Sequence, residues 1–412
     1  MPILRQGRNC WRIARAERAA VLIDGDAYFR AIDDAFRRAR RSILIVGWDF
    51  DGRIRLRPDD PEHPECLGPM LRSLVEANPG LHVRILVWSI AVVHTPSAPL
   101  ALLIGDEWQD HPRITLRLDT THPVYGSHHQ KIVCIDDAVA FAGGLDLTIE
   151  RWDTPRHASV APARTKPDGT PYGPVHDIQM AVDGEAARQV SAIARDRWRV
   201  ATGEALMPLE KADDPWPDGL RADFAETAVA IARSSPAWGE RENARECIAL
   251  TIDAIVSAER TVYIEAQYIT ATPIRKAIAR ALSRPDGPEI VVVVTRTSRS
   301  LLERLAMGAN QERLVRRLRR TDRFGRLRVY YPRLSAEPGS ADMMVHAKLV
   351  IVDDRFVRIG SSNLNNRSIG LDTELDLAIE AANEDERTAI AGRLDRLLAE
   401  HLDTEPQAVA TA

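Results

Sequence analysis

Histidine and lysine recur in one short pattern at two places in the chain. The pattern is H-x-K-x4-D, formed by His129, Lys131 and Asp136 and again by His346, Lys348 and Asp353. On a strand, residues two apart point to the same side, so each histidine is expected to project together with its lysine. The 55 basic residues include only five lysines, and a compact ammonium is not interchangeable with a guanidinium fork. Two of the five stand in these motifs, which indicates a site that needs point charges.

Together the two motifs contain the groups that phosphodiester cleavage requires. Two lysines would neutralise the non-bridging oxygens and the charge that develops in the transition state. One neutral imidazole can attack phosphorus and form a phosphohistidine. The other, protonated, can give a proton to the leaving alkoxide and later take one from water. The residues therefore predict a covalent mechanism that needs no metal or other cofactor, and the four cysteines have no metal-ligand spacing.

The motifs occupy equivalent points of an internal repeat. KIVCIDDAVAFAGGLDL, which starts at Lys131, and KLVIVDDRFVRIGSSNL, which starts at Lys348, superpose at a constant offset of 217 residues. Each predicts an apolar strand, a turn at paired aspartates and a returning strand that ends at glycine. The residues expected to shape these hairpins rather than to touch substrate are Asp136, Asp353, Gly143 and Gly360. A period this long indicates a duplicated domain.

Short β-branched runs alternate with helix-like stretches before each motif. The runs are 42–50, 82–88 and 114–119 in the first half and 261–269, 289–295 and 327–332 in the second; the helices are 28–40, 69–77, 244–258 and 273–282. This alternation predicts βαβ units. The expected fold class is α/β: two similar α/β/α halves with mainly parallel sheets, related by a pseudo-twofold axis, with a single active site at their interface. The polar segment 207–219 is expected to link the halves 1–206 and 220–412.

Residues 128–153 and 346–379 resemble the two active-site motifs of the phospholipase D superfamily, the second with the trailing G-S-x-N at residues 360–363. Residues 175–198 and 261–269 resemble two further segments of phospholipases D proper. The resemblance covers about residues 20–400. The double histidine at 128–129, the GG-x-D-L at 143–147 and the RWD at 151–153 favour the phospholipases over the nuclease branch of the superfamily.

The resemblance also implies roles for single residues. His129 would be the nucleophile, and His346 the general acid and base. Lys131, Lys348 and Asn363 would hold the phosphate oxygens.

Four more residues of the resemblance belong to the expected site. Ser361 and Asp146 are expected in the substrate-binding set. Asp177 and Glu374 match the acidic residues that accept a hydrogen bond from the histidine nitrogen not used in catalysis, which fixes the tautomer. His128, which has no counterpart in the second motif, is expected behind the site.

Two further features allow more than one interpretation. The run from Arg313 to Arg328 holds eight arginines in 16 residues; it is either a solvated helix face or a contact with an anionic membrane surface. His176 is expected to be structural or at the rim of the site. The polar loop 156–174 is expected to form a lid or a headgroup-contacting rim.

The function predicted is cleavage of the distal phosphodiester of glycerophospholipids, giving phosphatidic acid and the headgroup alcohol, or transfer to an alcohol acceptor. The alternatives are a cardiolipin synthase-type phosphatidyltransferase and a nuclease on the same fold. A net charge of −4 argues against a nucleic-acid partner. The first 20 residues are interrupted by arginine, and no stretch reaches roughly 18 apolar residues. The chain is therefore expected to be cytoplasmic, with peripheral membrane contact as the alternative.

Overall fold

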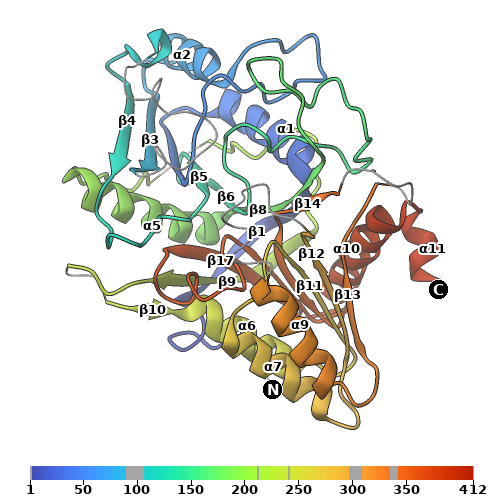
Figure 1. The fold of residues 1–412 in the computed structure, drawn as a ribbon. Helices are drawn as coiled ribbons and strands as arrows, with labels where there is room; N and C mark the ends of the chain where they lie inside the picture. Colours follow the sequence, from blue (N-terminus) through green and yellow to red (C-terminus); the bar gives the residue numbers. More distant parts are fainter. Residues whose placement is uncertain are drawn as a thin grey trace.

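One large sheet runs through the whole molecule, with helices on both faces (Figure 1). The computed structural model describes residues 2–89, 106–210, 213–239, 242–296, 309–334 and 342–411. In that part of the chain the sheet has 15 strands, and a two-stranded sheet joins β7 and β14. No helix among the described residues is both long and apolar enough to cross a membrane.

The elements of the first half are β1 (Arg12–Ile23), α1 (Asp24–Arg38), β2 (Ser42–Gly47), α2 (Leu67–Ala77), β3 (His82–Trp88), the 3-10 turn η1 (Glu107–Gln109), β4 (Ile114–Asp119), β5 (Ile132–Ile135), β6 (Val139–Gly143), β7 (Val175–His176), β8 (Ile178–Asp183) and α5 (Gly184–Thr202). Residues 207–210 and 213–219, in the predicted linker, form neither helix nor strand. The division into two domains stays a prediction.

The elements of the second half are β9 (Phe224–Ser235), β10 (Ala244–Arg245), α6 (Glu246–Ser257), β11 (Thr261–Ala266), α7 (Thr272–Ser283), β12 (Glu289–Val294), α9 (Ala309–Thr321), β13 (Leu327–Tyr330), β14 (Met344–Val345), β15 (Lys348–Val352), β16 (Phe356–Gly360), β17 (Glu374–Glu380), α10 (Glu384–Leu402) and α11 (Pro406–Ala410). The chain therefore repeats the order of the first half, with β9 in the place of β1 and α10 in the place of α5.

The strand order is the same when the sheet is followed inward from either edge. It runs β13-β12-β11-β15-β16-β17-β9-β1-β8-β6-β5-β2-β3-β4, with β10 paired to β9. At the centre β1 and β9 pair antiparallel, from Arg12 opposite Ile231 to Ala19 opposite Phe224. The first half, blue to green, and the second half, yellow to red, meet along these two strands (Figure 1). This order gives the two hairpins equivalent places on either side of the centre.

The α/β class is confirmed, and the pairing is more mixed than the predicted "mainly parallel". Parallel pairs join β2, β3 and β4 in one half and β11, β12 and β13 in the other. The main-sheet strands between these groups pair antiparallel. Connectivity explains the difference, because parallel neighbours need a long crossover whereas each motif strand returns through a tight turn. The two halves thus share one sheet instead of having one each.

Both faces of the sheet are buried, so its strands are almost continuously apolar. Along β2, Leu44 and Val46 belong to one apolar cluster, while Ile43 and Ile45 belong to another. The first cluster includes α5 and α10 and extends across both halves. On the opposite face α1 and α2 cover the first half, and α6, α7 and α9 cover the second. The loops at one end of this rigid core carry the histidine motifs.

The motif aspartates fasten the hairpin turns to the sheet. The carboxylate of Asp136 accepts the backbone N–H groups of residues 40, 41 and 42 at 2.7–2.8 Å. Asp353 accepts those of residues 259, 260 and 261 at 2.8–3.1 Å. Both aspartates have φ of +53°. Each therefore connects its turn to the start of the neighbouring strand, β2 or β11, which is a role in the fold.

Candidate active site

His129 is held by a carboxylate from the other half of the chain. Its Nδ1 lies 2.9 Å from Oε2 of Glu374 and 3.1 Å from the carbonyl oxygen of Ser361. Both partners accept, so Nδ1 carries the proton and Nε2 keeps a free electron pair. The side chain is 15% exposed, while that of Glu374 is fully buried. The ring is therefore fixed in the tautomer that a nucleophile needs, with access to solvent.

His346 has the reciprocal arrangement. Its Nδ1 lies 2.6 Å from Oδ2 of Asp177, which belongs to the first half. The carboxylate of Asp177 also accepts its neighbour's N–H, from Ile178, at 2.8 Å. The His346 side chain is 8% exposed. In both motifs Nδ1 is engaged, which leaves Nε2 as the nitrogen available for chemistry.

Backbone hydrogen bonds place the two histidines at matching points. The N–H of His129 donates to the carbonyl of Thr373, the residue before Glu374, at 3.0 Å. The N–H of His346 donates to the carbonyl of His176, the residue before Asp177, at 2.7 Å. Each motif is thus docked against the segment that supplies its carboxylate. The sequence predicted both carboxylates, and the structure shows that each serves the histidine of the opposite half.

The motif lysines are buried beside their histidines. Nζ of Lys131 donates to the carbonyl of His129 at 2.9 Å and lies 3.1 Å from Oδ2 of Asp146. Nζ of Lys348 donates to the carbonyl of His346 and lies 3.1 Å from Nδ1 of that ring. The positive charges of both lysines act on His129. The two ammonium groups therefore belong to the same electrostatic environment.

Burial and charge set the protonation states of this group. Burial, together with the charges of Lys131 and Lys348, holds the pKa of His129 well below its usual range. Burial also lowers the pKa of Lys348 to about 7, against the opposing effect of Asp177. Burial raises the pKa of Glu374 to about 8, although hydrogen bonds from serine side chains act in the opposite direction.

The pKa of Asp177 is shifted in the opposite direction from that of Glu374. Its burial would raise the pKa of the carboxyl group, but the charge and hydrogen bond of His346 and the charge of Lys348 outweigh it and lower the pKa to about 2. Asp177 is thus ionised at neutral pH, whereas Glu374 favours its neutral form. The two histidines therefore have unequal partners despite the symmetry of the fold.

The residues expected to bind substrate, besides the two lysines, are Ser361, Asp146 and Asn363. The first two already make contacts within the protein. Oγ of Ser361 donates to Glu374 at 2.5 Å, and Asp146 accepts the backbone N–H of Trp48 at 2.9 Å in addition to its ion pair with Lys131. Both are buried. The geometry favours positioning roles for Ser361 and Asp146 over contact with substrate.

Asn363 differs from these two residues. Its backbone N–H donates to Oγ of Ser368 at 3.1 Å, and among the described residues its buried Oδ1 has no hydrogen-bond partner. At the offset of the repeat, Asn363 is the counterpart of Asp146. A phosphate oxygen could accept a hydrogen bond only from Nδ2 of this amide, so the phosphate-binding role of Asn363 stays a prediction.

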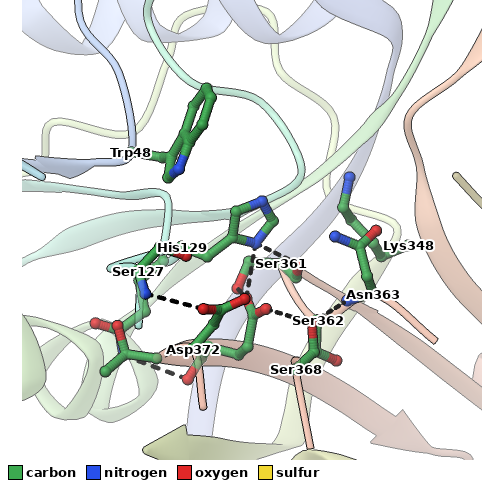
Figure 2. Close-up of polar contacts among 12 residues, drawn as sticks. Trp48, Ser127, His129, Lys348, Ser361, Ser362, Asn363, Ser368 and Asp372 are labelled. Atoms are coloured by element: carbon green, nitrogen blue, oxygen red, sulfur yellow. Dashed lines mark hydrogen bonds and ion pairs between the residues drawn. The ribbon is translucent and has the colours of Figure 1, made fainter. Parts of the chain in front are cut away.

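Ser368 is a site residue that the sequence did not indicate. Its Oγ donates to Oε1 of Glu374 at 2.6 Å, so that the carboxyl group is held by Ser361 on one oxygen and by Ser368 on the other. Figure 2 shows both serines below the His129 ring. Ser368 lies in an irregular segment outside the repeated pattern, and no spacing rule singles it out.

Tryptophan lines the first motif. The ring of Trp48 meets that of His129 edge-on at 6.4 Å between centroids and stacks on Trp88 at 5.8 Å. In Figure 2 the His129 ring lies between Trp48 and the segment that carries Ser361. Nζ of Lys131 lies 5.9 Å from the centre of the Trp48 ring. Trp48 thus forms an apolar wall beside the histidine and lysine of the first motif.

Glycines allow the carboxylate of Asp177 and the side chains of Gln179 and Asp376 to approach the hairpins closely. A Cβ at Gly144 would lie 2.0 Å from Oδ1 of Asp177. A Cβ at Gly143 would lie 2.3 Å from the side chain of Gln179, and one at Gly360 would lie 2.0 Å from Asp376. Glycine at 143 and 360 was predicted from the repeat; the need for Gly144 was not.

His128 and His176 lie outside this group. His128, expected behind the site, is buried, with Nδ1 3.0 Å from Oγ1 of Thr373 and 2.6 Å from a guanidinium nitrogen of Arg197. Burial and the charge of Arg197 lower its pKa to about 3. His176 is fully buried and contacts acidic side chains on both ring nitrogens. His128 thus packs against the Thr373 segment, while His176 belongs to a separate cluster.

The arginine run forms α9 and the strand that follows it. Leu314, Val315 and Leu318 are buried, while the arginines of the helix are exposed. Arg326 instead donates to carbonyl groups of residues 282, 284, 285 and 287. The run therefore includes an amphipathic helix with an exposed basic face and one arginine that stabilises the fold, and membrane contact through this face stays a prediction.

The loop 156–174 is attached to the protein by a buried ion pair. Arg164, which is 2% exposed, bonds both carboxylate oxygens of Asp153 at 3.0 Å. Lys166 lies 3.1 Å from Glu150, and the loop borders a cavity of about 490 Å³. A role of this loop as lid or headgroup rim stays a prediction.

Two family profiles match the chain. The one described as "Phospholipase D" matches residues 35–236, and the one described as "Cardiolipin synthase, PLD-like domain" matches residues 251–399. Each profile covers one of the two motifs.

Among similar curated proteins, phospholipase D A of Dictyostelium discoideum is 24% identical over 93% of this chain and 35% of its own length. Phospholipase D gamma 2 of Arabidopsis thaliana is 23% identical over 87% of this chain and 59% of its own. The chain thus spans about a third to three-fifths of the length of these relatives. Among solved structures, the phosphatidylserine synthase of Haemophilus influenzae aligns with a TM-score of 0.65 and 15% identity, covering 97% of this chain and 94% of that one. That likeness is one of fold.

Proposed function

The chain belongs to the phospholipase D superfamily, and we propose that it is a phosphodiesterase that cleaves the distal phosphodiester of glycerophospholipids through a phosphohistidine. The observation that carries the proposal is the reciprocal arrangement of the two motifs. His129 contacts Glu374 and His346 contacts Asp177, each a carboxylate of the opposite half, and each histidine has a buried lysine beside it, which supports one shared site.

In the first step, Nε2 of His129 attacks phosphorus as the bond to the headgroup oxygen breaks. The proton that the leaving alkoxide needs comes from Nε2 of His346. Burial and the charge of Lys348 hold the pKa of His346 well below its usual range, and ionised Asp177 acts in the opposite direction, which supports the protonated form in this role. The phosphatidyl group is then attached to His129, and the headgroup alcohol is released.

In the second step, His346 takes a proton from water, and the resulting hydroxide attacks the phosphohistidine. The products are phosphatidic acid and free His129; an alcohol in place of water gives a phosphatidyl alcohol. Lys131, Lys348 and the amide of Asn363 stabilise the charge on the phosphoryl oxygens in both steps. These groups supply the charge stabilisation without a metal at the phosphate.

A second candidate is transfer to a lipid hydroxyl, because the profile that matches residues 251–399 is that of a cardiolipin synthase domain. The chemistry is the same, and only the acceptor differs. The exposed arginines of α9 support a peripheral contact with anionic lipid in either case.

The experiment that tests the function offers a panel of phospholipids, and DNA as the rival substrate, with and without ethanol. The proposal predicts phosphatidic acid without ethanol and phosphatidylethanol with it. Cardiolipin formed from phosphatidylglycerol alone would identify the transferase. A purified preparation of His129→Ala serves as the control for contaminating activity. Cleavage of DNA without any change in phospholipid would overturn the assignment.

A further inference from the structure

A second group of histidines and carboxylates lies away from the reacting atoms. It consists of Asp24 at the start of α1, His157 in the loop after the first motif, His176 in β7 and Glu400 near the end of α10. One ligand atom from each of the four lies within 4.8 Å of all the others. Their side chains are at most 3% exposed. Residues far apart in the sequence thus converge on one buried point.

The spacing of the four side chains fits a tetrahedral ion. Nδ1 of His176 lies 2.9 Å from Asp24 and 2.8 Å from Glu400. Nε2 of His157 lies 3.0 Å from Glu400 and 3.5 Å from Asp24. Ligands about 2.0 Å from a central zinc are separated by about 3.3 Å in a tetrahedron. Four separations between histidine nitrogens and carboxylate oxygens are 2.8–3.5 Å, with Asp24 facing His176 through Oδ1 and His157 through Oδ2, and are therefore close to this value.

Each histidine has a carboxylate on its other nitrogen. Nε2 of His176 lies 2.8 Å from Oε2 of Glu265, and Nδ1 of His157 lies 3.0 Å from Oδ2 of Asp153. Without an ion, Nδ1 of His176 and Nε2 of His157 face carboxylate oxygens as hydrogen-bond donors. An ion at the shared point would replace the proton on each of these two nitrogens, while the nitrogens that face Glu265 and Asp153 keep theirs. Carboxylates that orient ligating histidines in this way are typical of zinc sites.

Some oxygens of the group lack partners. Among the described residues, the buried Oδ2 of Asp24 and Oε2 of Glu400 have no hydrogen-bond partner. Unpaired buried carboxylate oxygens are costly unless a cation balances them. Asp24 and His157 also have positive φ angles, of 66° and 41°, a conformation that non-glycine residues adopt at a free-energy cost.

We propose that Asp24, His157, His176 and Glu400 hold a structural Zn²⁺ ion. Two neutral imidazoles and two carboxylates give a neutral site with a divalent ion, and mixed nitrogen and oxygen ligands in a tetrahedron suit zinc. The inference concerns assembly of the fold and does not depend on the reaction proposed above.

The ion would support the second motif from behind. The carbonyl of His176 accepts the N–H of His346 at 2.7 Å, and the N–H of Asp24 donates to the carbonyl of Asp177 at 2.8 Å. Glu400 brings α10 of the second half into the same contact. A Zn²⁺ ion here therefore connects α10 to the strand that positions the Asp177–His346 pair.

The test begins with wild-type protein purified without a polyhistidine tag. Elemental analysis should find about one zinc per chain, and X-ray absorption should find two nitrogen and two oxygen ligands at about 2.0 Å. After chelation, added Zn²⁺ should raise Tm by at least about 5 °C. Protein without zinc whose Tm does not respond to Zn²⁺ would overturn the proposal without affecting the proposed reaction.

Two variants locate the ion. Glu400→Gln removes a ligand while keeping the shape of the side chain, and should weaken zinc binding by at least about 100-fold. His401→Gln is the matched control, because His401 contacts Glu265 rather than the ion, at 2.8 Å. It should keep one zinc. Zinc retained by Glu400→Gln, or lost from His401→Gln, would show that the four ligands are assigned wrongly. If Glu400→Gln does not fold, the absorption spectrum of the wild type decides.

Discussion

The side chains of Lys131 and Lys348 are buried beside the motif histidines. Each donates to the carbonyl of its own histidine, and both are at most 3% exposed. A guanidinium is larger and planar, so it would displace the phosphate that the lysine should contact. Lys131→Arg and Lys348→Arg should each lose at least about 100-fold in turnover with little change in Tm. The exposed Lys276 provides the control, since Lys276→Arg should match the wild type. Near-normal turnover of either motif variant would remove that lysine from the mechanism.

The pKa of Lys348 also predicts the pH dependence of the reaction. Because burial lowers that pKa to about 7, the ammonium is present below this pH and is lost above it. The value of kcat/KM should therefore fall as the pH rises through about 7, since the transition state loses a positive charge. His129, whose pKa lies well below its usual range, stays neutral over the same interval.

A pH series with a soluble phosphodiester checks this. Lys348→Arg should be slow but should lack the fall above neutral pH, because a guanidinium stays charged. A wild-type kcat/KM that stays constant up to about pH 9 would contradict the assignment of the fall to Lys348.

At the level of elements, the close approach of the first hairpin to β8 depends on Gly144. A Cβ there would lie 2.0 Å from Oδ1 of Asp177. Gly144→Ala should therefore push Asp177 away from His346 and lower kcat by at least about 100-fold, at a stability cost of about 1–3 kcal/mol. In α10, Gly392 has open space around it, so Gly392→Ala should keep full activity. Equal activity of the two variants in steady-state assays would mean that the contact at Gly144 is unimportant.

The elements show which sequence signals suffice. Strands β3 and β4 have the predicted bounds, since their runs are short, β-branched and flanked by turns. The central strands β1 and β9 were not predicted. In β1, arginines alternate with small apolar residues at first, and only the last residues form an apolar run. A continuous apolar run is therefore not a sufficient signal for a strand whose outer end is partly exposed.

The candidate site could be predicted from the sequence only in part. Histidine and lysine stand at fixed places in the repeat, so their types and spacing were sufficient, whereas Asp177 and Glu374 were expected only from the resemblance to the phospholipase D superfamily. The resemblance places one acidic residue downstream of each motif, which leaves open whether each serves its own half or the opposite one. Only the packing of the halves along β1 and β9 decides that question, in favour of the opposite half.

For the whole molecule, the pairing of each histidine with a carboxylate of the opposite half means that a change in one half should impair the histidine of the other. Asp177→Asn should behave like loss of His346: the covalent adduct forms from an activated substrate and then persists. Glu374→Ala removes the carboxyl group, whose neutral form a glutamine would mimic, and should behave like damage to His129 and slow adduct formation. Each should reduce steady-state turnover by at least about 100-fold, because the ring loses its orienting carboxylate. Rapid-quench kinetics with a nitrophenyl phosphodiester separates the two steps. The reverse assignment of defects would show that the crossed contacts do not govern the chemistry.

The central claim is that His129 carries the phosphoryl group while His346 moves protons. Intact-mass spectrometry after addition of a nitrophenyl phosphodiester tests it most directly, because a good leaving group needs no acid. If His129 is the nucleophile, an added phosphoryl group is expected on His346→Ala and on His346→Asn, and none on His129→Ala, with all three variants folded as judged by Tm. An adduct on His129→Ala and none on the His346 variants would contradict the assignment.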